Sequence, residues 1–194
     1  MIVCLPILEN LSEHYDALAK AIVKAGASPH HTLVTLAVQS NDDAAYQFSE
    51  AVADIYGKNV KITLEDQLRS PKDIANRFFN AACRAFQKIG DTKFPMLYMD
   101  PTYRPTTKFW LDNLQANYFR SGAPEVFANF QPEISTPQGP IILSMKYVTT
   151  STLRQFLPPG THWRSYLAME MRVKNSPEAS ESLTNQLTCT NRTP

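Results

Sequence analysis

Asp100 is the acidic residue whose setting most suggests chemistry. It directly follows an apolar segment at 95–99 that predicts a buried strand. A carboxylate at the end of such a strand has no packing role. Such a carboxylate suits a metal ion or a hydroxyl group of a bound ligand. The alternative is local, because an Asp before Pro101 also favours an Asx-type turn.

A basic and an amide side chain share one face of a predicted helix at 71–89. Ser70 and Asp73 form a capping box around Pro71, so the helix begins there, and Lys72 and Asn76 lie one turn apart near its start. A helix N-terminus with these side chains can hold a diphosphate or the edge of a pyrimidine. The alternative is that Lys72 is solvated and Asn76 packs against a loop.

Basic and aromatic residues also alternate in the last third of the chain. The residues concerned are Arg154, Phe156, His162, Trp163, Arg164, Tyr166, Arg172 and Lys174. Aromatic rings could stack on a base or a sugar while the arginines meet phosphates. The reading we favour is plainer, with Trp163 facing the core and the arginines in solvent.

The elements that carry these residues alternate between strand and helix. Apolar segments at 2–7, 32–38, 60–64 and 95–99 predict four strands, and helical periodicity separates them, with stops at Gly26 and Gly57. This order predicts parallel strands with right-handed crossovers. The fold class is therefore α/β, a mostly parallel sheet with helices on both faces.

The carboxyl ends of parallel strands lie at one edge of a sheet, where ligands bind. Here those ends are the polar segments 6–10, 39–43, 65–72 and 100–104. We expect them to converge on one site.

The pattern changes after Asp100. We expect an amphipathic helix at 106–120, strands at 125–130 and 141–145, a short helix near 150–156 and a last helix at 163–173. The polar segment from 175 predicts a flexible tail. Residues 1–174 would form one domain.

Composition and missing motifs exclude several classes. The 194 residues carry a net charge of +1 and are 43% hydrophobic, which is typical of a globular protein and predicts no overall attraction to nucleic acid or membrane. The chain has no phosphate loop, GxGxxG, HExxH or GxSxG motif. We expect a cytoplasmic location, because the three cysteines are scattered and the N-terminus does not resemble a leader. The sequence also has no apolar segment of about 20 residues.

The segment 70–120 resembles the GT-A glycosyltransferases of the family-two-like group, in the small versions that bacteriophages encode. In that group a helix with a basic residue and Asn precedes a strand that ends in an acidic metal motif. A proline and a Trp-Leu pair follow. The matching residues here are Lys72, Asn76, Asp100-Pro101-Thr102, Pro105 and Trp110-Leu111. The broader similarity covers about residues 1–145. It implies that the domain at 1–174 has a nucleotide-sugar-binding half at 1–105 and an acceptor half at 106–174.

The resemblance implies a pocket for a nucleotide-sugar donor, with a uridine-diphosphate sugar favoured. The residues expected to surround the base and ribose are Pro6, Glu9, Gln39 and Asn41. Glu65 or Asp66 would contact the uracil or the ribose, although these two could equally form a solvated turn. The transferase would move the sugar to an acceptor hydroxyl.

The metal motif departs from the family, because Thr102 replaces its second acid. Three readings stay open. Asp100 alone could hold Mn²⁺ or Mg²⁺ with the diphosphate oxygens, Arg104 could neutralise the leaving diphosphate without a metal, or the chain could be non-catalytic.

An inverting transferase also needs a base, for which Glu170 ranks before Glu133 and Asp112. Acceptor contacts would come from Arg154, His162, Trp163 and Arg164. The more specific acceptor is a hydroxymethylated base in double-stranded phage DNA, and the broader one a glycan or small molecule. Alternatives to a transferase are a nucleotide-sugar-binding module and a nucleotidyltransferase.

Overall fold

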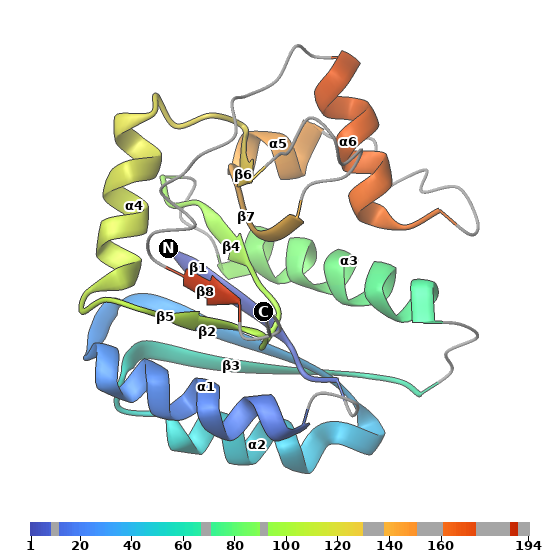
Figure 1. Ribbon diagram of the computed structural model, residues 1–194. Coiled ribbons are helices and arrows are strands. Elements are labelled where there is room, and N and C mark those ends of the chain that lie inside the picture. Colours follow the sequence, from blue (N-terminus) through green and yellow to red (C-terminus); the bar gives the residue numbers. More distant parts are fainter. Residues whose placement is uncertain are drawn as a thin grey trace.

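The computed structural model describes residues 1–8, 12–66, 71–89, 93–129, 138–150, 161–173 and 187–189. A six-stranded sheet runs through its centre in the order β3-β2-β1-β4-β7-β6 (Figure 1). The first four strands in that order are parallel, and β7 is antiparallel to both β4 and β6. The strands are β1 (Ile2–Pro6), β2 (Ser28–Val38), β3 (Tyr56–Leu64), β4 (Met96–Tyr98), β6 (Val126–Asn129) and β7 (Gln138–Leu143). The expected α/β class is confirmed.

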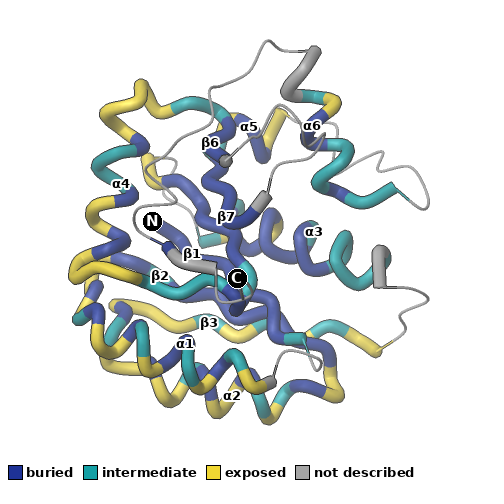
Figure 2. The backbone as a smooth tube through the Cα atoms, in the orientation of Figure 1, coloured by how far each residue is buried: buried dark blue, intermediate teal, exposed yellow. Residues whose placement is uncertain are grey.

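Helices cover both faces of the sheet. On one face lie α1 (Ser12–Ala25), α2 (Asp42–Ala51) and α4 (Trp110–Arg120), and on the other lie α3 (Pro71–Ile89), α5 (Met145–Thr150) and α6 (Trp163–Val173) (Figure 1). Each face has its own apolar core, because successive strand residues point to opposite sides of the sheet. Figure 2 shows the continuous burial of β1 and β4 between these layers. No helix in the described ranges is long and apolar enough to cross a membrane.

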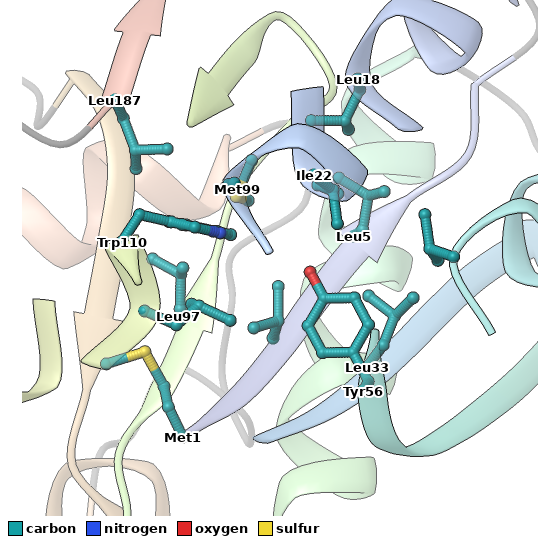
Figure 3. Packing of buried hydrophobic residues seen from close by; sticks show 14 of the residues in the cluster. Met1, Leu5, Leu18, Ile22, Leu33, Tyr56, Leu97, Met99, Trp110 and Leu187 are labelled. Carbon is teal, nitrogen blue, oxygen red and sulfur yellow. The ribbon is translucent and has the colours of Figure 1, made fainter. Parts of the chain in front are cut away.

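Two short strands form a second sheet that the sequence did not predict. β5 (Tyr103–Pro105) pairs antiparallel with β8 (Leu187–Cys189), which lies inside the expected tail. Leu187 is 2% exposed and belongs to the same core cluster as Trp110, beside which Figure 3 shows it. The expectation of a flexible tail therefore does not hold at these three residues, because burial of Leu187 stabilises the pairing.

Gly57 has a different role from the expected one. The second helix ends at Ala51, and Gly57 lies inside β3 instead of stopping the helix. A Cβ on Gly57 would lie 2.0 Å from the carbonyl oxygen of Pro29, so only glycine lets the two strands approach here. This close approach extends β2 and β3 back to Ser28 and Tyr56, through a bulge between Ser28 and Thr32.

Boundaries also differ in the second half. The helix expected at 106–120 begins at Trp110, and α5 begins at Met145, earlier than the helix expected near 150–156. The end of that expected helix lies outside the described residues. The last helix has the expected bounds.

Candidate functional site

A cavity of about 1000 Å³ opens at the carboxyl edge of the parallel strands. We call it the strand-end cavity. It is lined by Pro6, Leu8, Val38, Ser40, Asn41, Asp66, Ile74, Ala75, Phe78, Tyr98, Asp100, His162, Trp163 and Arg164. All four parallel strands contribute their carboxyl ends, which confirms the expected convergence, and the first turns of α3 and α6 close the remaining sides.

Polar groups follow β2 and β3 at one side of this cavity. The backbone N–H and the hydroxyl of Ser40 both donate to Asp66 Oδ1, at 3.2 and 3.1 Å. Asn41, from the same short 3₁₀ turn, also lines the cavity and is 9% exposed. Ser40 therefore fixes the carboxylate of Asp66 at the end of the sheet.

The carboxylate of Asp100 lies after β4 and is held by its own turn. Its Oδ1 accepts hydrogen bonds from the hydroxyl of Thr102 and from the Thr102 backbone N–H, the latter at 3.3 Å. This is the Asx-type turn that the sequence offered as the alternative, yet the same side chain also lines the cavity. Thr102, which the resemblance aligns with the second acid of the metal motif, is thus a hydrogen-bond donor to Asp100.

Arg164 lies beside Asp100 in the lining of the cavity, an arrangement that the sequence did not indicate. Its Nη2 lies 4.0 Å from Asp100 Oδ2, and its side chain is only 17% exposed. Nη1 donates to the Gly139 carbonyl oxygen at 2.8 Å, and the guanidinium stacks 4.6 Å from the ring centroid of Trp163. Burial lowers the pKa of this guanidinium and Asp100 opposes that shift, but a guanidinium stays protonated in proteins.

Trp163 belongs to the core, as the favoured sequence interpretation stated. Its side chain is 2% exposed and stacks on Phe79 with ring centroids 4.1 Å apart and an interplanar angle of 9°. Tyr98 meets the same ring edge-on at 5.3 Å. The ring is therefore a fixed platform beneath Arg164, with little surface left to stack on a base or sugar.

The start of α6 is capped by side chains. His162 Nδ1 accepts from the Arg164 N–H at 3.2 Å, and the His162 carbonyl accepts from the N–H groups of Ser165 and Tyr166. Asn76 Oδ1 accepts from the Trp163 N–H at 2.9 Å. The first four N–H groups of α6 are thus satisfied within the protein, so positive charge at this end of the cavity comes from the Arg164 side chain.

Four residues predicted to bind the nucleotide do not line the cavity. The side-chain amide of Asn76 makes two hydrogen bonds to the backbone, one through its nitrogen to Thr161 and one through its oxygen to Trp163. Gln39 and Glu65 are exposed. Arg104 lies in β5 opposite Thr188, because the turn after Asp100 carries the chain toward α1. Its Nε is buried and has no hydrogen-bond partner among the described residues.

Glu170, the expected base, lies two turns along α6 from the cavity. Its carboxylate accepts a hydrogen bond from the Tyr147 hydroxyl of α5 and does not line the cavity. Asp112 Oδ1 accepts a 2.9 Å hydrogen bond from Nε2 of His31, at the opposite end of β2. Glu9, Glu133, Arg154 and the side chain of Lys72 lie outside the described residues.

Tyr15 positions the loop after β1, a contact that sequence reasoning missed. Its hydroxyl oxygen accepts a hydrogen bond from the Leu8 N–H, and its O–H donates to the Leu8 carbonyl oxygen at 3.1 Å. Burial raises the pKa of this phenol, so it stays a neutral donor. A tyrosine at the fourth position of a helix gives no sign in the sequence that it reaches back to the preceding loop.

The donor set around Asp100 fits a divalent cation poorly. Mg²⁺ and Mn²⁺ prefer several oxygen ligands, and carboxylates supply the charge. Within the described ranges no group of three or more His, Cys, Asp or Glu side chains could hold a metal. The neighbours of Asp100 are the Thr102 hydroxyl and a guanidinium, which already brings a positive charge to the carboxylate.

Comparisons with known proteins show the fold and not the family. No protein-family model and no curated protein matches the sequence. Among solved structures, the apo form of glycosyltransferase GlyE from Streptococcus pneumoniae TIGR4 matches with a TM-score of 0.57 and 14% identity, over 93% of this chain and 44% of that one. The apo bifunctional glycosyltransferase WbbM gives 0.58 and 10%, over 89% and 37%. Galactosyltransferase LgtC, solved with donor and acceptor sugar analogues, gives 0.52 and 10%, over 95% and 69%.

The fold is therefore that of GT-A-like glycosyltransferases, as the resemblance predicted. The chain spans less than half the length of GlyE and WbbM. At these identities the likeness concerns the backbone, and the residues of the site must be argued from this chain alone.

Proposed function

We propose that the protein transfers a sugar from a nucleotide-diphosphate donor to an acceptor hydroxyl. The observation that carries this proposal is the strand-end cavity itself. It lies where GT-A-like folds converge their parallel strands, and its lining brings the carboxylates of Asp66 and Asp100 together with the partly buried guanidinium of Arg164. Its volume of about 1000 Å³ is at the upper end of ordinary ligand sites, which suits a nucleotide together with a sugar.

The lining suggests how the donor lies. Apolar residues on two sides, including Leu8, Val38 and Ile74, can enclose a planar base. Asp66 and Asn41 stand at the ends of β3 and β2, where they can accept and donate hydrogen bonds to ribose hydroxyls or a base edge. The diphosphate then extends toward Asp100 and Arg164. A uridine-diphosphate sugar remains the favoured donor.

The reaction separates charge, and the cavity would stabilise that separation. The bond between the anomeric carbon and the β-phosphate oxygen breaks, and its electron pair leaves with the diphosphate. The acceptor oxygen forms the new bond to the anomeric carbon and releases its proton to solvent. Holding the reactants in line and stabilising the leaving diphosphate are the two contributions that these residues can make.

Asp100 is placed to contact the transferred sugar, because its carboxylate lines the cavity beside Arg164. We assign it to the sugar hydroxyls in this proposal. Glu170 takes no part in it, since its carboxylate is bonded to Tyr147 away from the cavity.

The acceptor is a sugar or other small hydroxyl compound in this proposal. GlyE, WbbM and LgtC are all described as glycosyltransferases, and LgtC was solved with an acceptor sugar analogue. Double-stranded DNA and a bacteriophage origin remain predictions of the sequence. Trp163 is buried, so it offers DNA no exposed ring for stacking.

Donor turnover tests the proposal directly. The purified chain is incubated with uridine-, guanosine-, adenosine-, cytidine- and thymidine-diphosphate sugars, and release of the nucleoside diphosphate is followed with and without added glycans. We expect one nucleotide to be released, faster with an acceptor present. Release of none, together with no binding of any nucleoside diphosphate by calorimetry, would exclude the proposal.

A binding module without catalysis is the second candidate. It is favoured by one observation, that Thr102 occupies the place of the second acid and engages the carboxylate of Asp100. This alternative predicts nucleoside-diphosphate binding in the calorimeter with no turnover of any donor.

A further inference from the structure

We propose that Arg164 binds the donor diphosphate in the role that a divalent cation has in related sites, so that nucleotide binding needs no metal. This inference rests on the proposed function and names the residue that receives the phosphates. Arg164 is the one permanent cation among the described residues that line the strand-end cavity.

The guanidinium is held in place before any ligand arrives. Trp163 supports one of its faces at 4.6 Å, and Trp163 is itself fixed between Phe79 and Tyr98. The Gly139 carbonyl oxygen accepts from Nη1 at 2.8 Å. A planar fork fixed at its face and at one end loses little conformational entropy on meeting a phosphate, whose oxygens match its geometry.

Asp100 forms a long ion pair with this guanidinium and no direct hydrogen bond. The 4.0 Å between Asp100 Oδ2 and Nη2 exceeds the distance of a hydrogen bond, while Oδ1 is engaged by Thr102. The charge of Asp100 keeps the buried guanidinium paired in the free protein. A diphosphate that enters next to Arg164 then replaces this loose pairing with shorter, charge-assisted hydrogen bonds.

The position also suits the charge that develops during transfer. As the donor bond breaks, the leaving diphosphate gains one negative charge, and the acceptor gives up one proton to solvent. A fixed guanidinium at low exposure stabilises that charge more strongly than a solvated lysine does. The α6 amides cannot supply this stabilisation, since their hydrogen bonds are made within the protein.

Calorimetric titration of the full chain tests the inference. Uridine, uridine monophosphate and uridine diphosphate are titrated in EDTA and again with Mn²⁺, and the other four nucleoside diphosphates are used if uridine diphosphate does not bind. We expect uridine diphosphate to bind equally in EDTA and in Mn²⁺. Arg164→Gln should weaken it by about ten- to hundredfold while uridine binding stays within about twofold.

Arg120→Gln, an exposed arginine on α4, is the matched control and should change nothing. Arg164→Lys keeps the charge without the fork and should fall between the wild type and Arg164→Gln. If neither Arg164 variant folds, the affinity of the wild type for uridine diphosphate in EDTA still tests whether binding needs a metal. Binding that requires Mn²⁺, or Arg164→Gln with unchanged affinity, overturns the role of Arg164 and leaves the proposed function standing. No binding of any nucleoside diphosphate in either buffer overturns both.

Discussion

Asn76 on α3 accepts a 2.9 Å hydrogen bond from the backbone N–H of Trp163, the first residue of α6, through its side-chain Oδ1. The same amide donates through Nδ2 to the Thr161 oxygen at 2.8 Å. Two helices with 73 residues between their nearest ends are thereby fixed to each other beside the cavity. Because Arg164 follows Trp163 directly, Asn76 positions the cationic side of the site without touching the ligand.

Replacing Asn76 should therefore affect both stability and binding. Asn76→Ala leaves the Trp163 N–H and the Thr161 carbonyl without their partner, which should cost about 1–3 kcal/mol in the free energy of unfolding. Affinity for the nucleoside diphosphate should fall as well, because Arg164 is less firmly placed. Urea denaturation and calorimetry measure the two effects. Asn113→Ala on α4, whose amide bonds the Lys108 oxygen at the surface, serves as control, and equal losses in both variants would contradict this role.

Asp100→Asn separates two roles for that residue. If Asp100 contacts the sugar, the variant should lose donor turnover but keep nucleoside-diphosphate binding in EDTA, or tighten it, because a negative charge is removed from beside the phosphates. If Asp100 instead held a metal, Mn²⁺ would enhance wild-type binding and the variant would lose that enhancement. Calorimetry with and without EDTA, beside a turnover assay, distinguishes the two.

Gly139 and Gly122 form a matched pair of glycines with positive φ, +74° and +82°. Alanine at either position is strained by about 1–2 kcal/mol. Only at Gly139 would the new Cβ also meet another residue, the Tyr103 hydroxyl at 2.8 Å, and only Gly139 accepts from Arg164. Gly139→Ala should lower Tm further than Gly122→Ala and should alone weaken nucleotide binding. Equal effects on binding would contradict the contact with Arg164.

The buried strand β8 should contribute measurably to stability. Leu187→Ala removes a side chain that is 2% exposed from the cluster around Trp110, and such changes cost about 2–5 kcal/mol in the free energy of unfolding. Met169→Ala, at a residue 59% exposed, should stay within about 0.5 kcal/mol. Thermal denaturation of both variants measures the difference. A wild-type Tm in Leu187→Ala would show that β8 is not packed as described.

The N-terminal amine gives the free energy of unfolding a pH dependence of known sign. Met1 bonds His31 Nδ1 at 2.9 Å, and burial lowers the pKa of the amine to about 6 from 8.0. Burial, and then the charge of this amine, also lower the pKa of His31. The unfolded chain therefore binds more protons than the folded chain between about pH 6 and 8, so stability should rise with pH through this window.

Urea denaturation at several pH values from roughly 5.5 to 8.5 measures that slope, because this range includes the pKa of the amine in both the folded and the unfolded chain. His31→Gln should remove only the part of this slope that the imidazole contributes, since the pKa of the amine is lowered mainly by burial. A free energy of unfolding that falls as pH rises from 6 to 8 would contradict the assignment.

The sequence was sufficient to predict the sheet edge at which the strand-end cavity lies. Apolar segments that end in polar residues mark buried parallel strands, and topology then brings Asn41, Asp66 and Asp100 together without knowledge of any side-chain contact. The core position of Trp163 also followed from its amphipathic helix.

The pairing of Asp100 with Arg164 could not be predicted in the same way. Arg104 is near Asp100 in sequence, but a turn carries it into β5, while Arg164 arrives from 64 residues away because Asn76 and Phe79 hold the start of α6. The pairing of β5 with β8 was missed for a similar reason. A three-residue strand in a polar segment has no periodicity, and burial of Leu187 in the cluster that contains Trp110 helps to stabilise it.

A crystal structure of the protein with the nucleoside diphosphate that binds it, grown in EDTA, tests the central claim most directly. We predict the nucleoside beside Asn41 and Asp66, with phosphate oxygens within hydrogen-bond distance of the Arg164 guanidinium. A nucleotide bound elsewhere on the molecule, or phosphates turned away from Arg164, would contradict the claim that the strand-end cavity is the donor site.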